Sequence, residues 1–86
     1  MTITWHPVAP KLSRPAGRHV LARATFPDGT VVETYRDEAP MGARAYGWRV
    51  VSRGSRATRR DVGRGSQQSG GAARDSAARH LRHLWT

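Results

Sequence analysis

Two stretches of the chain, separated by a strong turn signal, have the hydrophobic pattern or the composition of strands. In residues 19–26 the apolar Val20, Ala22, Ala24 and Phe26 recur with a period of two, and residues 30–36 are rich in Val, Thr and Tyr. Residues 27–29 read Pro-Asp-Gly. The Pro presets φ, the Asp side chain caps the turn and the Gly accepts a positive φ. The pattern therefore predicts a β-hairpin.

A three-residue loop fixes the register of this hairpin. The expected cross-strand pairs are Ala24 with Val32, Ala22 with Thr34, Arg23 with Glu33 and Leu21 with Tyr35. An Arg opposite a Glu and a Leu opposite a Tyr are favourable neighbours on a sheet, which supports this register.

Three further segments precede the C-terminus. Residues 46–53 alternate again and predict a third strand. The Pro-rich residues 1–17 favour an extended N-terminus, within which residues 3–5 are compatible with a short edge strand. Residues 54–71 are rich in Gly, Ser and Arg and poor in apolar side chains, so they predict a flexible basic loop.

Residues 72–86 predict a C-terminal helix. At about 100° per residue, their apolar side chains fall within a stripe of about 120°. The stripe consists of Ala73, Ala77, Leu81, Leu84 and Trp85. Residues 1–86 then form a single small α+β domain, in which a three-stranded antiparallel sheet over residues 18–53 carries the helix on one face (β-β-β-α).

The small side chains of Ala22 and Ala24 would let the helix approach one face of the sheet closely. We therefore expect the helix face to contain Val20, Ala22, Ala24, Phe26, Val32, Trp48 and Val50. The opposite face then contains Arg23, Thr25, Glu33, Tyr35, Arg49, Val51 and Arg53. Because Leu21, Val31 and Tyr35 form a second apolar set, the pattern alone leaves the choice of face open.

The charge balance indicates a polyanionic partner. The 86 residues include 15 Lys and Arg, all but Lys11 being Arg, against six Asp and Glu, for a formal net charge of +9. The Arg guanidinium suits phosphate groups and guanine edges because its donors form a planar fork. We therefore expect a surface that binds nucleic acid or an acidic protein.

The sequence lacks the groups that catalysis or a metal site needs. It has no Cys, and its four His show no zinc-ligand spacing. No nucleophile–base pair can be recognised, and the Gly-rich residues 65–72 lack the Lys and the Ser or Thr of a phosphate loop. We expect neither an enzyme nor a bound cofactor or metal. With no apolar run of membrane-spanning length and no signal-peptide pattern, a cytoplasmic protein without membrane contact is expected.

These observations favour a small nucleic-acid-binding accessory or regulatory protein, with DNA favoured over RNA. A twisted sheet can enter a major groove, where strand side chains reach base edges while flanking Arg hold phosphates, and a Tyr can stack on an unpaired base. The candidate nucleic-acid-binding residues are Arg23, Tyr35, Arg49, Arg53, Arg56, Arg59, Arg60 and Arg64. Among them, Arg49 and Arg53 are the expected base readers because a strand holds them.

The same composition fits a second function, a small protein-interaction module or inhibitor of the phage or mobile-element type that docks on an acidic protein surface. Trp and Arg are favoured anchors of protein interfaces, so this alternative requires an aromatic patch that stays exposed after folding. The sequence decides neither between the two partners nor on the oligomeric state.

Overall fold

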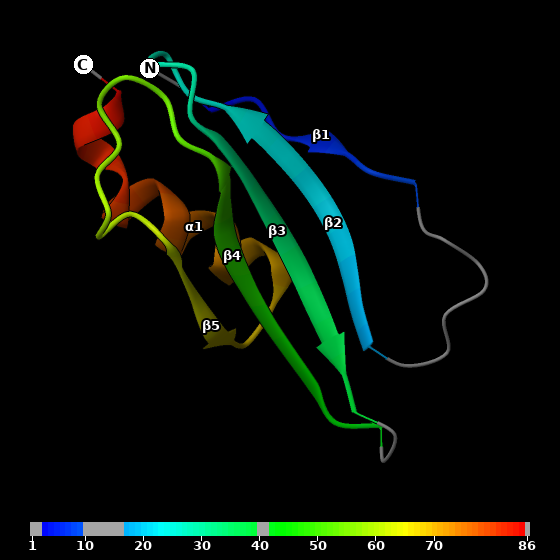
Figure 1. Cartoon of the computed structure of the whole chain (residues 1–86). Helices are drawn as coiled ribbons and strands as arrows, with labels where there is room; N and C mark the ends of the chain where they lie inside the picture. The colour runs from blue at the N-terminus through cyan, green and yellow to red at the C-terminus, as the bar shows by residue number, and fades with distance from the viewer. Residues whose placement is uncertain (1–2, 10–16, 40–41, 86) are drawn as a thin grey trace.

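The protein is an α+β structure in which one C-terminal helix packs on a five-stranded antiparallel sheet (Figure 1). The computed structural model describes residues 3–9, 17–39 and 42–85. The strands are β1 (His6–Pro7), β2 (Gly17–Thr25), β3 (Val31–Glu38), β4 (Arg44–Ser52) and β5 (Gly63–Gln67), and they lie in the sheet in chain order. The helix α1 (Gly70–His80) and the 3-10 helix η1 (Arg82–Leu84) follow. The α+β class and the C-terminal helix are confirmed, whereas the prediction of three strands is wrong.

The first of the two additional strands, β1, lies at the N-terminal edge of the sheet. It pairs with β2 over two positions, and the Val8 N–H donates a hydrogen bond of 2.9 Å to the Leu21 carbonyl. An edge position tolerates Pro7, which has no N–H to donate. The short edge strand expected at residues 3–5 therefore lies slightly further along the chain.

The second additional strand, β5, lies inside the segment 54–71, so the prediction of a loop is wrong for Gly63–Gln67. This strand has no hydrophobic alternation and pairs with β4. A Cβ at Gly63 would collide with the Trp48 carbonyl and the Arg49 Cα, so Gly63 permits the close pairing. β5 forms because β4 offers a partner edge, which local propensity does not reveal.

The helix begins two residues earlier than expected. Ser69 is its N-cap, because its hydroxyl oxygen accepts a hydrogen bond of 3.0 Å from the Ala72 N–H. α1 ends at His80, and η1 replaces the last turn of the predicted helix. The predicted stripe still faces the sheet: Ala73, Ala77, Leu81 and Leu84 are buried, and Trp85 is half-buried.

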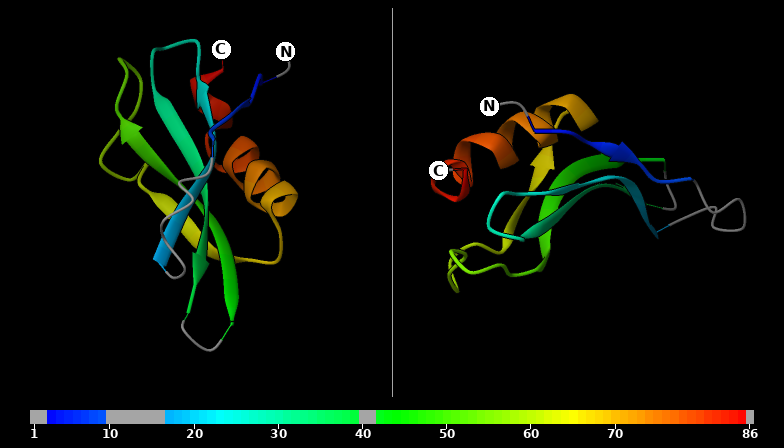
Figure 2. Two further views of the ribbon diagram at one scale, coloured as in Figure 1. Left: turned by 90° about the vertical axis from the view of Figure 1, so that its right-hand side faces the viewer. Right: turned by 90° about the horizontal axis from the view of Figure 1, so that it is seen from above.

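The core lies between α1 and one face of the sheet (Figure 2). The sheet contributes Ala22, Ala24, Phe26, Val32 and Trp48, all at most 3% exposed, and the half-buried Val50 packs beside them. These positions confirm the expected helix face for all of its residues except Val20. Ser76 of α1 is also buried, and its hydroxyl oxygen accepts a hydrogen bond of 3.0 Å from Trp48 Nε1.

A β-bulge in β2 exchanges the expected positions of Val20 and Leu21. The pairs Ala24–Val32, Ala22–Thr34 and Arg23–Glu33 are confirmed, but the register shifts between Val20 and Ala22. Val20 therefore lies opposite Tyr35, on the face away from α1. Leu21 Cδ1 lies 3.5 Å from where a Cβ on Gly70 would stand, beside the start of α1. The expectation that Val20 faces the helix and the pairing of Leu21 with Tyr35 are wrong.

Candidate nucleic-acid interface

Arg23, Glu33 and Arg49, which we call the triad, form a row across β2, β3 and β4 on the sheet face away from α1. The Glu33 carboxylate accepts a hydrogen bond of 3.3 Å from Arg23 Nε on one oxygen and one from Arg49 Nε on the other. The side chain of Glu33 is 1% exposed, whereas those of Arg23 and Arg49 are 55% and 48% exposed. A buried carboxylate thus fixes two half-exposed guanidinium groups, and each keeps N–H donors for a further partner.

Tyr35 lies on the same sheet face, but it is covered. Its side chain is only 7% exposed, and the guanidinium carbon of Arg18 lies 3.8 Å from the centre of its ring. Asp37 holds Arg18 there by accepting two hydrogen bonds of 2.8 and 3.0 Å. A Cβ on Gly47 would overlap the Tyr35 hydroxyl, so the ring extends over this glycine. The ring face that a base would stack on is occupied by Arg18.

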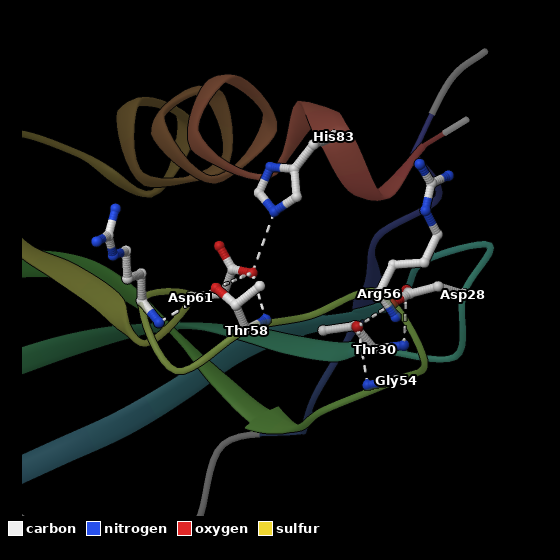
Figure 3. Close-up of polar contacts among 8 residues, drawn as sticks. Asp28, Thr30, Gly54, Arg56, Thr58, Asp61 and His83 are labelled. Atoms are coloured by element: carbon white, nitrogen blue, oxygen red, sulfur yellow. Dashed lines mark hydrogen bonds and ion pairs between the residues drawn. The ribbon is translucent and has the colours of Figure 1, made fainter.

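The carboxylate of Asp28, in the turn between β2 and β3, organises the start of residues 54–62, which we call the anchored loop (Figure 3). It accepts hydrogen bonds from the Thr30 N–H at 3.0 Å, the Thr30 hydroxyl at 2.6 Å and the Arg56 N–H at 3.1 Å. The Gly54 N–H in turn donates to the Thr30 hydroxyl oxygen at 2.9 Å. Burial acts to raise the pKa of Asp28, but these hydrogen bonds outweigh it, so the pKa is lowered.

A second carboxylate, that of Asp61, holds the other end of the anchored loop (Figure 3). Its Oδ2 accepts hydrogen bonds from the Thr58 N–H at 2.8 Å, the Thr58 hydroxyl at 3.3 Å and His83 Nε2 at 3.1 Å. Burial acts to raise the pKa of Asp61, but the hydrogen bonds from Thr58 and His83 outweigh it and lower the pKa. Because His83 belongs to η1, Asp61 ties the anchored loop to the C-terminal end of the chain.

The anchored loop carries three of the candidate residues, and a fourth, Arg53, precedes it directly. Because β4 ends at Ser52, the expectation that a strand holds Arg53 is wrong. Arg53, Arg56, Arg59 and Arg60 are all exposed. Within residues 3–9, 17–39 and 42–85, no ion pair involves Arg53, Arg59 or Arg60. The hydrogen bond from the Arg56 N–H to Asp28 holds the loop backbone beside the turn between β2 and β3, and the bonds of Asp61 hold it beside Thr58 and His83.

Arg64 lies apart from the other candidates. It pairs with Trp48 across β4 and β5, and partners in an antiparallel pair lie on the same face of a sheet. Arg64 is therefore on the helix side, whereas Arg23 and Arg49 are on the opposite side. The structure brings the triad into one row and groups the residues from 53 to 60, but it does not join Arg64 to either set.

The anchoring role of Asp61 is not among the sequence predictions. A signal was present, because a Thr followed three residues later by a carboxylate is a spacing at which side chain and backbone bond locally. No local sequence signal indicates that the Arg18 guanidinium lies over the Tyr35 ring. This contact depends on the bulge that brings Val20 opposite Tyr35 and on the pairing of Arg18 with Asp37.

Within the part of the chain that the structure describes, no group of three or more His, Cys, Asp or Glu side chains is placed to hold a metal ion. None of the helices described here is long and apolar enough to cross a membrane. Comparison of the chain with protein-family models, with curated proteins and with solved structures gives no match. Function is therefore inferred from the geometry alone.

Proposed function

We propose that the protein is a small DNA-binding accessory or regulatory protein that contacts its ligand through Arg23, Arg49 and the arginines from 53 to 60. The observation that carries this proposal is the separation of acidic and basic groups at one end of the molecule. Asp28 and Asp61 direct their carboxylates to backbone N–H groups, hydroxyl groups and His83. The neighbouring arginines are exposed to solvent.

This separation leaves an excess of positive charge on the surface. Asp28 and Asp61 anchor the loop through its backbone, and Arg53, Arg59 and Arg60 keep their guanidinium groups in solvent. On the sheet face away from α1, the triad adds two guanidinium groups against one buried carboxylate. A clustered positive surface attracts a polyanion and accelerates its binding.

The exposure of the aromatic residues supports DNA over an acidic protein as the partner. Aromatic side chains can anchor a protein interface only if they are exposed on the free protein. Phe26, Tyr35 and Trp48 are buried, and Trp5, Tyr46 and Trp85 are half-buried. The basic surface therefore offers many charges and no fully exposed aromatic anchor, which is the composition of a phosphate-binding surface.

A salt titration tests the proposal. Binding to a mixed-sequence duplex should weaken steeply with salt, with a log–log slope of about −0.9 for each phosphate neutralised. Replacement of Arg53, Arg59 and Arg60 by Ala should flatten that slope by roughly 2 to 3, since each phosphate contact contributes about 1.

A matched control removes the same charge elsewhere. Arg74 and Arg79 lie on α1, and Arg44 begins β4 at the end of the strand remote from Arg53. Replacement of these three residues by Ala should leave the salt slope close to that of the wild type. If no duplex binds more tightly than about 100 µM at low salt, the proposal is wrong, because even non-specific binding reaches that affinity. An acidic protein would then become the preferred partner.

A further inference from the structure

The ion pairs of the triad bear on the base-reading role expected for Arg49. A bidentate contact with guanine requires a guanidinium that can align with two acceptors on the base edge. Arg49 is held through Nε by Glu33, which Arg23 also contacts, so a base contact could use only its two Nη groups, in the orientation that this ion pair sets. If Arg49 turned toward a base, the Glu33 carboxylate, whose side chain is 1% exposed, would keep only Arg23 as an ion-pair partner. Uncompensated buried charge is unfavourable, so the triad favours keeping both guanidinium groups in place.

The second expected route to sequence recognition is stacking on Tyr35. Arg18 covers the ring, and Asp37 fixes Arg18 through two hydrogen bonds. Stacking of an unpaired base would require Arg18 to move away from both Tyr35 and Asp37. Single-strand binding depends on open aromatic platforms, and this sheet face does not offer one at Tyr35.

We infer that the protein binds the phosphate backbone of duplex DNA without reading its base sequence. This inference rests on the proposed function and specifies its ligand. In the triad, the Nε atoms of Arg23 and Arg49 bind Glu33, while the remaining donors of each half-exposed guanidinium face solvent and suit phosphate oxygens. Arg53, Arg59 and Arg60 add exposed charges in and beside the anchored loop and would contact phosphates without selecting a base.

Selection from a pool of duplexes with a randomised central segment tests the inference on the wild-type protein. After repeated selection, the recovered duplexes should bind no more than about tenfold tighter than the starting pool, because specific sites usually exceed non-specific ones by about 10³-fold or more. A recovered motif bound about 10³-fold tighter would overturn the inference and leave DNA binding intact. Single-stranded DNA of the same sequences should bind more weakly than duplex; tighter binding of the single strand would also overturn it. Failure of the whole pool to bind at low salt would overturn the proposed function as well.

The substitution Glu33→Gln tests the part played by the triad. It removes the one negative charge beneath Arg23 and Arg49 and keeps the shape of the side chain. The folded variant should bind every duplex about twofold to fivefold more tightly, which is the size of one surface charge interaction. Asp75→Asn, on the exposed surface of α1, removes the same charge and should leave the affinity unchanged. Unchanged or weaker binding by a folded Glu33→Gln protein would show that the triad does not contact DNA. If this variant does not fold, the selection experiment still decides the inference.

Discussion

His83 Nε2 lies 3.1 Å from Asp61 Oδ2, and this contact joins η1 to the anchored loop. The same oxygen accepts the hydrogen bonds of Thr58. Asp61 therefore has two roles: its bonds to Thr58 fix the loop conformation, and its bond to His83 holds the loop against η1. The sequence predicts a flexible segment here, because residues 54–62 contain little that could pack in a core. Two carboxylates, those of Asp28 and Asp61, hold this loop, and Ala57 is its apolar residue that packs against the core.

The substitution Asp61→Asn should loosen the anchored loop. The neutral amide oxygen of Asn accepts the hydrogen bonds of Thr58 and His83 more weakly than a carboxylate does, so the side-chain contact with η1 is weakened. Backbone order parameters in this loop should fall from near 0.85, typical of rigid structure, toward about 0.6. Asp75→Asn is the matched control and should leave the loop unchanged. Equal order parameters for the wild type and Asp61→Asn would contradict the anchoring role.

Acid should destabilise the protein through three carboxylates. Hydrogen bonds from Arg18 lower the pKa of Asp37 from its ordinary value of 3.8, and the pKa values of Asp28 and Asp61 are lowered because their hydrogen bonds outweigh burial. A carboxyl group with a lowered pKa in the folded state stabilises the protein fully above its unfolded pKa. That contribution is lost as the pH falls through the folded pKa.

The free energy of unfolding contributed by these groups should therefore be constant from about pH 7 to about pH 5 and decline below about pH 4. Urea denaturation at each pH measures it. Asp28→Asn has one less group to protonate, so its stability should decline less steeply in acid than that of the wild type. A wild-type stability that does not change down to about pH 2 would contradict the three assignments.

The hydrogen bond from Trp48 to Ser76 should stabilise the helix on the sheet. In Ser76→Ala the buried Nε1 of Trp48 loses its acceptor, and an unsatisfied buried donor costs about 1–3 kcal/mol. Ser52→Ala, at an exposed position at the end of β4, should cost much less. Chemical denaturation compares the two. Trp48→Ala removes the whole side chain and should cost about 3–5 kcal/mol. Similar stabilities for Ser76→Ala and Ser52→Ala would show that the hydrogen bond contributes nothing.

The local pattern of the chain predicts some elements well and others not at all. The hairpin from β2 to β3 was predictable because alternation and the Pro-Asp-Gly turn agree on one register, and that agreement holds for Arg23 and Glu33. β5 was not predictable, since a Gly-Arg-Gly-Ser-Gln segment becomes a strand only beside the edge of β4. The bulge at Leu21 likewise has no local signal. A shift of one residue then moved Val20 to the opposite face.

The candidate interface shows the same division between local and long-range information. The exposure of Arg59 and Arg60 follows from a polar, Gly-rich segment, whereas Arg53, expected on a strand, lies just after the end of β4 at Ser52. The burial of Tyr35 beneath Arg18 and the burial of Glu33 between two arginines depend on contacts between strands. A list of charged residues therefore identifies where a polyanion would bind, but the ion pairs decide how each guanidinium can be used.

Gly54 lies where the anchored loop meets the turn between β2 and β3. A Cβ at this position would overlap the backbone of Asp28 and Thr30, and backbone atoms cannot move aside as the end of a flexible side chain can. Gly54→Ala should therefore cost about 1–3 kcal/mol through overpacking. It should also weaken the hydrogen bond from the N–H of residue 54 to Thr30.

Gly71→Ala is the matched control, and it should raise the stability of the protein. A Cβ there meets only Ser69 Oγ at 3.8 Å, and Ala in a helix is favoured over Gly by about 0.5–1 kcal/mol. In thermal unfolding, Gly54→Ala should have a lower melting temperature than the wild type and Gly71→Ala a higher one. A Gly54→Ala protein as stable as the wild type would mean that the loop does not approach the turn this closely.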